Sequence, residues 1–162
     1  MATKIPLVLG TDGNIQQLQN GDSIIVATAN TDVYALTNAE ASAVVIGAPV
    51  YVFGADQFKK AQANASAPSK AWGMVYDSPN IANGASGQVA TDGIVTATTT
   101  QWDAVTGQTG GLTPGSDYFL DAATSGKMTT TPPTTIGQYV VKLGKALSTT
   151  KFDLSVDSPI LL

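Results

Sequence analysis

The stretch from Gly107 to Pro133 constrains the fold of this chain more than any other part of the sequence. Pro114-Gly115 predicts a tight reversal, because proline holds φ near the value that a turn needs and glycine accepts positive φ. The aromatic run Tyr118–Leu120 predicts a short strand, and Asp121–Gly126 predicts a second polar turn. The residues that follow return as a strand until two consecutive prolines end it, since neither can donate to a ladder.

The rest of the chain is built from similar material. Only 12% of its 162 residues are charged, and Thr, Ala, Ser and Gly dominate the polar and small positions. Amphipathic surface helices need charged outer faces, so this composition favours short strands and many turns. We therefore predict an all-β fold, a compact β-barrel or sandwich of short strands. Residues 1–22 are predicted to form an extended N-terminal arm, and residues 23–162 a single β domain.

Two local patterns add detail to this fold. Thr100–Thr106 predicts one short helix, because a threonine can cap its start and Gly107 can stop it. Asp92-Gly93 lies between the β-prone runs 89–91 and 94–96 and predicts a tight type I′ hairpin. Further strands are predicted from apolar or alternating runs at Ile24–Val26, Val44–Ile46, Val50–Phe53, Phe58–Ala61, Ala71–Tyr76, Gly137–Leu147 (with a bulge at Gly144) and Lys151–Val156.

The N-terminal arm contains the apolar run Ile5-Pro6-Leu7-Val8-Leu9, in which the proline favours an edge or unpaired extended segment. Two interpretations are open: the arm completes the domain's own sheet, or it reaches a neighbouring subunit. In the second case Ile5, Leu7 and Leu9 would be the anchors. The run is too short for the core of a signal peptide, and no segment is long enough to span a membrane, so we expect a soluble protein made in the cytoplasm.

The two halves of the chain share a pattern. Each has a glycine that leads into an aromatic strand, a return strand that carries lysine, a proline-containing loop and a second aromatic strand with its own glycine. Gly47 and Gly115 are 68 residues apart, as are Lys59 and Lys127. One interpretation is a duplicated β-unit, with repeat halves at roughly 44–95 and 107–156. The other is coincidence among the residues that commonly punctuate β-structure.

Several function classes are excluded or disfavoured by the composition. The chain has no cysteine and no histidine, so disulfides, thiolate metal sites, cysteine nucleophiles and histidine bases are absent. All eight basic residues are lysine, the net charge is −4 and the pI is about 4.4. A phosphate-binding surface needs clustered Lys and Arg, so we predict no nucleic-acid partner.

Carboxylates are the only catalytic candidates. Asp117 and Asp121 flank the Tyr118–Leu120 strand and could form a glycosidase-like pair, although both also suit strand-end turns. Asp12-Gly13-Asn14 superficially resembles a calcium loop but lacks the further ligand spacing. Gly84–Gly87 lacks the lysine of a phosphate loop. We therefore predict no enzyme, no cofactor and no metal site.

Two further features are candidate binding sites. Lys59-Lys60 is interpreted as a solvated strand end. Trp72 and Trp102 could form a platform on which a sugar stacks, although single tryptophans of this kind more often anchor a core or an interface.

A resemblance narrows the function. Residues Thr100–Leu120, with Gly-Gly-Leu-Thr-Pro-Gly and an aromatic strand, then Gly126–Thr129, Pro132-Pro133 and Gly144–Ser148, resemble a small β module of virion proteins from tailed bacteriophages. Such modules occur in head decoration (capsid cement) proteins and at the ends of tail-fibre-like proteins. Lys4–Leu18 also resembles the opening of phage structural proteins.

The resemblance implies a structural protein on the outer head surface of a virion, assembled in the cytoplasm of the bacterial host. Its implied partners are the major capsid protein and two further copies of itself in a homotrimer, with no membrane partner. The chain has no coiled-coil heptads or shaft repeats, which fits a decoration protein better than a complete fibre. Two alternatives remain: a tail-fibre or tail-tip component, and a carbohydrate-binding adhesin that uses Trp72 or Trp102.

Overall fold

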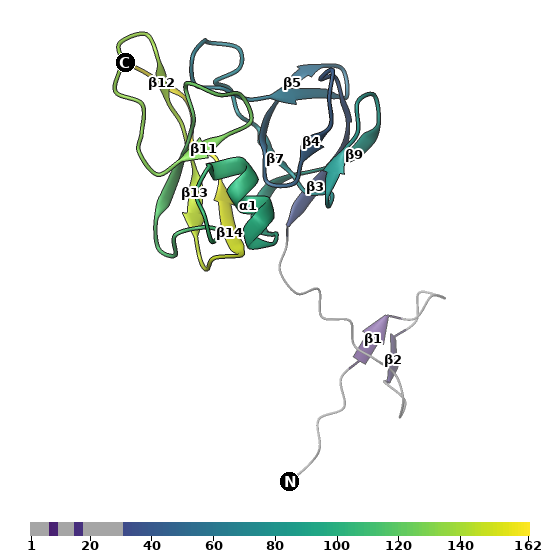
Figure 1. The fold of residues 1–162 in the computed structure, drawn as a ribbon. Coiled ribbons are helices and arrows are strands. Elements are labelled where there is room, and N and C mark those ends of the chain that lie inside the picture. The colour runs from purple at the N-terminus through teal and green to yellow at the C-terminus, as the bar shows by residue number, and fades with distance from the viewer. Residues whose placement is uncertain (1–6, 10–14, 18–30) are drawn as a thin grey trace.

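The computed structural model describes residues 7–9, 15–17 and 31–162. Strands account for 42% of the structure and helix for 6%, so the prediction of an all-β fold with one short helix is confirmed. The body of the molecule is a closed five-stranded barrel joined to a second group of strands (Figure 1). At the N-terminus, β1 (Leu7–Leu9) pairs antiparallel with β2 (Ile15–Gln17). The predicted strand at 24–26 lies outside the described residues.

The barrel closes because the strand at one end of its pairing order also pairs with the strand at the other end. The order is β9-β3-β6-β5-β7, and β7 pairs back onto β9. The β3–β6 pair is parallel and the other pairs are antiparallel. Because the barrel is closed, each of these five strands has a partner strand on both sides over at least part of its length. The strands are β3 (Asp32–Asn38), β5 (Pro49–Gly54), β6 (Gln57–Lys60), β7 (Gly73–Val75) and β9 (Ser86–Thr96).

The second group of strands extends the same sheet beyond β9. The order continues as β9-β14-β13-β10-β11, with every pair antiparallel. Two short ladders lie outside the main sheet, β4 with β8 and β12 with β15. The bounds are β4 (Val44–Val45), β8 (Asn80–Ile81), β10 (Asp117–Leu120), β11 (Met128–Thr129), β12 (Tyr139–Val140), β13 (Lys142–Ala146), β14 (Lys151–Ser155) and β15 (Ile160–Leu161).

Two apolar clusters hold these parts together. One is built around Phe58, Val50 and Val89 on the barrel strands. The other joins residues of β7 and β9 to the helix and the second group of strands. At its centre the ring of Phe152 lies 5.8 Å from that of Trp102 and 5.9 Å from that of Tyr118, and all three side chains are buried. Aromatic contacts at these separations add to the gain from burial alone.

The single helix of the described chain, α1 (Thr99–Thr106), begins within one residue of its predicted start. Thr98 and Gln101 form a capping box, and Gly107 ends the helix in the left-handed conformation with φ 70°. The ammonium group of Lys127 donates a hydrogen bond to the Ala104 carbonyl, which has no partner within the helix. Turn chemistry at both ends therefore sets the length of α1.

The predicted hairpin at Asp92-Gly93 is wrong. β9 runs without interruption from Ser86 to Thr96, although Gly93 does have a positive φ of 93°. The ladder with β3 shifts register beside Thr91, so the glycine lies next to a bulge and not in a reversal. The physical reason is that β3, β7 and β14 all offer hydrogen bonds to this strand. An extended conformation satisfies more of them than a turn would.

The other local predictions have mixed outcomes. The β10–β11 hairpin is present, and the register of β10 on β13 shifts beside Gly144, as the predicted bulge requires. β14 has alternating exposed and buried side chains, as predicted. The structure adds a seven-residue strand, β3, that the sequence does not predict, because its apolar residues 33–36 are consecutive and do not alternate with polar ones.

The pairing order recurs in the two halves. The first half contains the antiparallel series β6-β5-β7-β9, and the second contains β11-β10-β13-β14. The turns that precede β5 and β10 have the same conformation at their glycines, since Gly47 and Gly115 each have φ 79°. Ala48 N donates to Val45 O, and 68 positions later the same bond joins Ser116 and Thr113 at the same distance of 3.2 Å. The duplicated β-unit stays a prediction, with which this correspondence is compatible.

Closure of the barrel predicts a strict requirement at Gly73. A methyl group there would overlap the carbonyl oxygen of Ala90 on the partner strand. We expect Gly73→Ala to lower the free energy of unfolding by about 1–3 kcal/mol, the usual cost of overpacking. Gly54→Ala is the matched control: it is also a strand glycine without positive φ, and its methyl group would meet only the flexible Gln57 side chain at 3.3 Å. Urea unfolding measures both, and equal stabilities for the two variants would contradict this account of closure.

Candidate functional site

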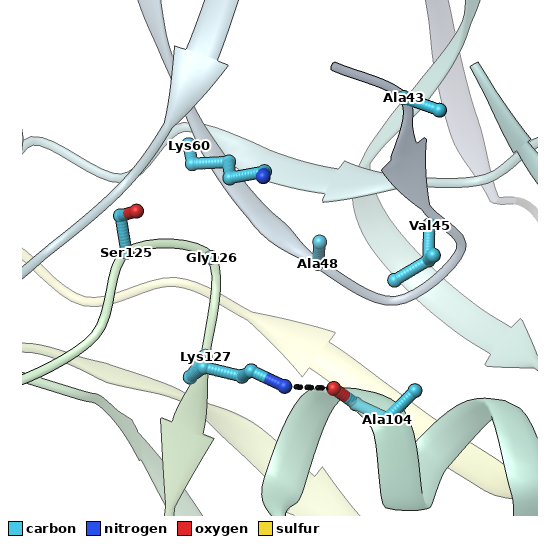
Figure 2. Close-up of a pocket in the computed structure, with 8 residues that line it drawn as sticks. All are labelled: Ala43, Val45, Ala48, Lys60, Ala104, Ser125, Gly126 and Lys127. Carbon is cyan, nitrogen blue, oxygen red and sulfur yellow. Dashed lines mark hydrogen bonds between the residues drawn. The ribbon is translucent and has the colours of Figure 1, made fainter. Parts of the chain in front are cut away.

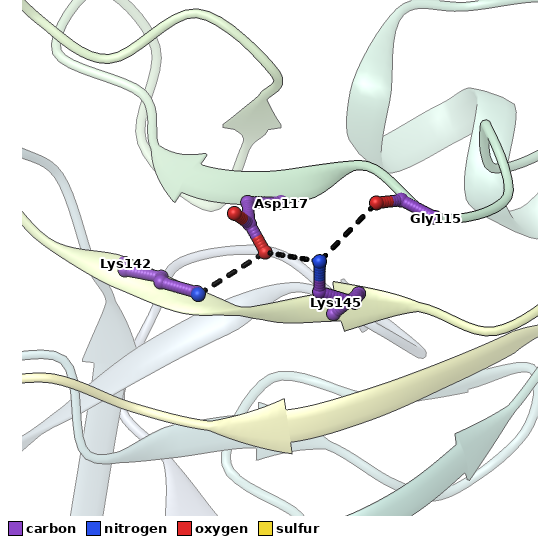
Figure 3. Close-up of polar contacts among 4 residues, drawn as sticks. All are labelled: Gly115, Asp117, Lys142 and Lys145. Carbon is purple, nitrogen blue, oxygen red and sulfur yellow. Dashed lines mark hydrogen bonds and ion pairs between the residues drawn. The ribbon is translucent and has the colours of Figure 1, made fainter.

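The densest group of charges in the described chain surrounds Asp117 (Figure 3). Its carboxylate lies 3.1 Å from Lys142 Nζ and 3.3 Å from Lys145 Nζ. Lys145 Nζ also donates to the Gly115 carbonyl at 3.3 Å. This bond joins β13 to the turn that precedes β10. The ammonium group of Lys142, followed by that of Lys145, holds the pKa of Asp117 below its ordinary value. The group is exposed to solvent by about a third or more of each side chain, so it is a screened surface cluster.

Asp117 and Asp121 each have separate structural contacts. Asp121 Oδ1 accepts hydrogen bonds from the backbone N–H groups of Ala123 and Thr124, and so holds the turn between β10 and β11. Asp117 is instead neutralised by two lysines. A glycosidase needs one carboxylic acid with a raised pKa, whereas the two lysines lower the pKa of Asp117. The strand-end interpretation of both residues is the one that their contacts support.

The two tryptophans have different surroundings. Trp102 is completely buried, and its indole N–H donates to the Thr150 carbonyl at 3.1 Å. A saccharide cannot reach it, so the expectation that Trp102 could form a stacking platform is wrong. Trp102 is buried because α1 places it against Phe152, a residue far away in the sequence. The sequence alone does not show this contact.

Trp72 is half-buried beside an exposed neighbour. Its ring lies 5.3 Å from that of Tyr34 at an angle of 54°, and Tyr34 is 52% exposed. Tyr34 lies on β3, so this surface aromatic pair forms between residues that are far apart in the sequence. Trp72 therefore keeps the accessible aromatic surface that Trp102 lacks.

A small cleft separates the barrel from the helix (Figure 2). Its volume is about 200 Å³, and alanine, valine and glycine make up most of its wall. Lys60 and Lys127 are its two charged residues, and Lys127 is already bonded to the Ala104 carbonyl. One remaining cation and one serine hydroxyl give no convergent set of groups for catalysis.

Lys59, which precedes Lys60 of the cleft, contacts an aromatic ring. Lys59 lies with its ammonium group 3.9 Å from the centre of the Phe53 ring. This is a cation–π contact at a strand end. Both Lys59 and Lys60 are half-buried, so the pair is less solvated than the sequence interpretation expects.

An exposed apolar surface lies at the β12–β15 ladder. Ile136 is 90% exposed, and Ile160, Leu161 and Leu162 are also open to solvent. Gly137 N donates to Leu162 O at 3.0 Å, which brings the loop carrying Ile136 beside the last strand. We call these four residues the β12–β15 surface. Several exposed apolar side chains in one region make it a candidate interaction site on a soluble protein.

The remaining candidates from the sequence carry no site. Gly84 N donates to Asn38 O and Ala85 N donates to Ala82 O, so this loop has no free N–H cradle for a phosphate. Leu7 and Leu9 lie in β1, while Ile5 and the Asp12–Asn14 segment lie outside the described residues. Within the described ranges no group of three or more acidic, histidine or cysteine side chains could hold a metal ion. Across the same residues, no helix has the length and apolar character needed to cross a membrane.

Comparison with known proteins adds no relative: no family model, curated protein or solved structure matches the chain.

The ion pairs of Asp117 predict a pH dependence. Its folded-state pKa lies below the ordinary 3.8, so its stabilising contribution is fully present above that value and is lost as the pH falls through the folded pKa. We expect Asp117→Asn to be less stable than the parent protein at neutral pH, and the difference to vanish under strongly acidic conditions. Urea unfolding across this pH range measures the difference.

The control is Lys142→Met, which removes the first of the two cations. Carboxyl NMR titration should then show the pKa of Asp117 moving upward towards its ordinary value. A difference between parent and Asp117→Asn that does not change with pH would refute the assignment.

Proposed function

We propose that this chain is a structural virion protein that binds the outer surface of a phage capsid and stabilises the head as a decoration protein. The observation that carries the proposal is the exposed β12–β15 surface on a closed β body. The resemblance of residues 100–148 to phage virion modules supports the same class.

The chemistry of the described residues suits adhesion better than catalysis. The one charged cluster is satisfied internally, and the cleft beside the helix is small and mostly apolar. A cement protein needs a stable body and complementary contact surfaces. Each copy then needs only modest contacts, because repetition over the lattice and the effective concentration within an oligomer raise the overall binding strength.

Two surfaces would make these contacts. The first is the N-terminal arm of residues 1–22, in which Ile5, Leu7 and Leu9 supply apolar anchors. The second is the β12–β15 surface, where Ile136 and Ile160 are 90% and 64% exposed. In a homotrimer on the shell, one surface would face the major capsid protein and the other a neighbouring copy.

The arm is tested by deleting residues 1–20. The described ladders of the body lie within residues 32–161, so we expect the truncated chain to fold and remain soluble. It should no longer co-sediment with shells assembled from the major capsid protein of the same phage. Undiminished co-sedimentation would remove the arm from the proposal, and loss of the β signal in circular dichroism would show that the arm belongs to the body.

The β12–β15 surface is tested by Ile136→Ser combined with Ile160→Ser. Both side chains are exposed, so the fold should keep its stability within about 0.5 kcal/mol. Co-sedimentation with shells, or the fraction of trimer in analytical ultracentrifugation, should fall at least several-fold. Leu147→Ser is the matched control, since Leu147 is 51% exposed and lies outside this surface.

Wild-type behaviour of the double variant in both assays would exclude this surface. Cryo-EM of the virion separates head from tail: many copies over the shell support the proposal, and a few copies at the tail would replace it with a tail component.

A further inference from the structure

An open pocket beside Trp72 borders the β12–β15 surface, because Pro159 in its lining directly precedes Ile160. Its volume is about 430 Å³, within the usual range for small-molecule sites. It is lined by Lys70–Trp72, by Val156–Pro159 and by Thr91 of β9. The pocket therefore joins three segments that only the tertiary fold brings together.

The aromatic wall is held in place by its neighbours. Trp72 N donates to the Val50 carbonyl at 2.8 Å, which fixes the backbone to the barrel. The Tyr34 ring, 5.3 Å away and tilted by 54°, supports the indole from its side. The Trp72 side chain also packs against the barrel cluster, while part of it remains open to solvent. A ring positioned in this way loses little entropy on binding a ligand.

The polar groups of the pocket are of mixed kind. Asp157 supplies a carboxylate that only accepts hydrogen bonds, and Lys70 supplies an ammonium group that only donates. The Ser158 and Thr91 hydroxyls can do either. One positive and one negative charge leave the pocket formally neutral, which favours neither an anion such as a nucleotide nor a simple cation.

We propose that this pocket binds a neutral saccharide. The apolar face of a pyranose ring would lie on the Trp72 indole, while its hydroxyl groups would bond to Asp157, Ser158 and Lys70. A ligand with one apolar face and many hydroxyls matches a wall that has one aromatic ring and several small polar groups. Binding would be weak at a single site, and several copies on one particle would strengthen it through avidity.

Backbone hydrogen bonds hold both lining segments in place. Asp157 N donates to the Lys142 carbonyl at 2.8 Å, and Ala71 N donates to the Ser69 carbonyl at 2.8 Å. Ser69 is fully buried, and its hydroxyl donates to the Ser66 carbonyl. The loop that carries Lys70 and Trp72 is therefore fixed before any ligand arrives, which is the condition for a selective site.

The test uses the chain of 162 residues and needs no capsid, so its result is independent of the decoration function. A glycan array of neutral mono- and oligosaccharides identifies candidates, and ¹H–¹⁵N NMR titration with each hit follows the two indole N–H signals. We expect at least one saccharide to shift the Trp72 signal and leave that of buried Trp102 in place. Trp72→Ala and Asp157→Asn should each weaken binding by about ten-fold or more.

Phe53→Ala is the matched control, because Phe53 is an exposed aromatic residue outside the pocket and its loss should not change affinity. If Trp72→Ala does not fold, Trp72→Phe and Asp157→Asn decide the question. The proposal is overturned if no neutral saccharide shifts the Trp72 signal at about 10 mM, a range that covers weak lectin-like affinities. Full binding by folded Trp72 and Asp157 variants would overturn it equally.

Discussion

The backbone hydrogen bonds of β9 are the interaction on which the rest of the structure depends. The strand pairs with β3 along one edge, with β7 to close the barrel, and with β14 to attach the second group of strands (Figure 1). The bulge beside Thr91 and the positive φ of Gly93 let one strand serve these partners in turn. Its buried Ala90 and Val95 contribute to the apolar cluster that spans both parts. Opening β9 would therefore break the barrel and the second group together.

Burial decides what each aromatic residue can do in this fold. Trp102 and Phe152 fill the cluster between helix and sheet, and there they stabilise by packing. Trp72 and Tyr34 have the same chemistry but lie at the rim of the barrel, where part of each ring meets water. The sequence does not predict which of Trp72 and Trp102 is buried, because the residues next to each in the chain do not indicate burial or exposure. The difference arises from strand pairings across long stretches of chain.

The charge pattern explains why the candidate functions are binding functions. The sparse carboxylates are used to hold turns and strand ends, as Asp121 holds the β10–β11 turn and Asp103 accepts bonds from Gly110 and Gly111. The lysines beside Asp117 neutralise it instead of raising its pKa. The surfaces left open are apolar or aromatic, and these suit protein or sugar contacts.

The sequence by itself determined the β class, the helix between Thr98 and Gly107, and the hairpin from β10 to β11. These features depend on turn and capping residues, which act over a few positions and can be read locally. It also excluded histidine and cysteine chemistry. The tertiary structure alone decided that Asp92-Gly93 continues a strand, that β7 returns to β9, that Trp102 is buried and that Ile136 meets the last strand. Each of these depends on hydrogen-bond partners and neighbours far away in the chain, which local propensity cannot specify.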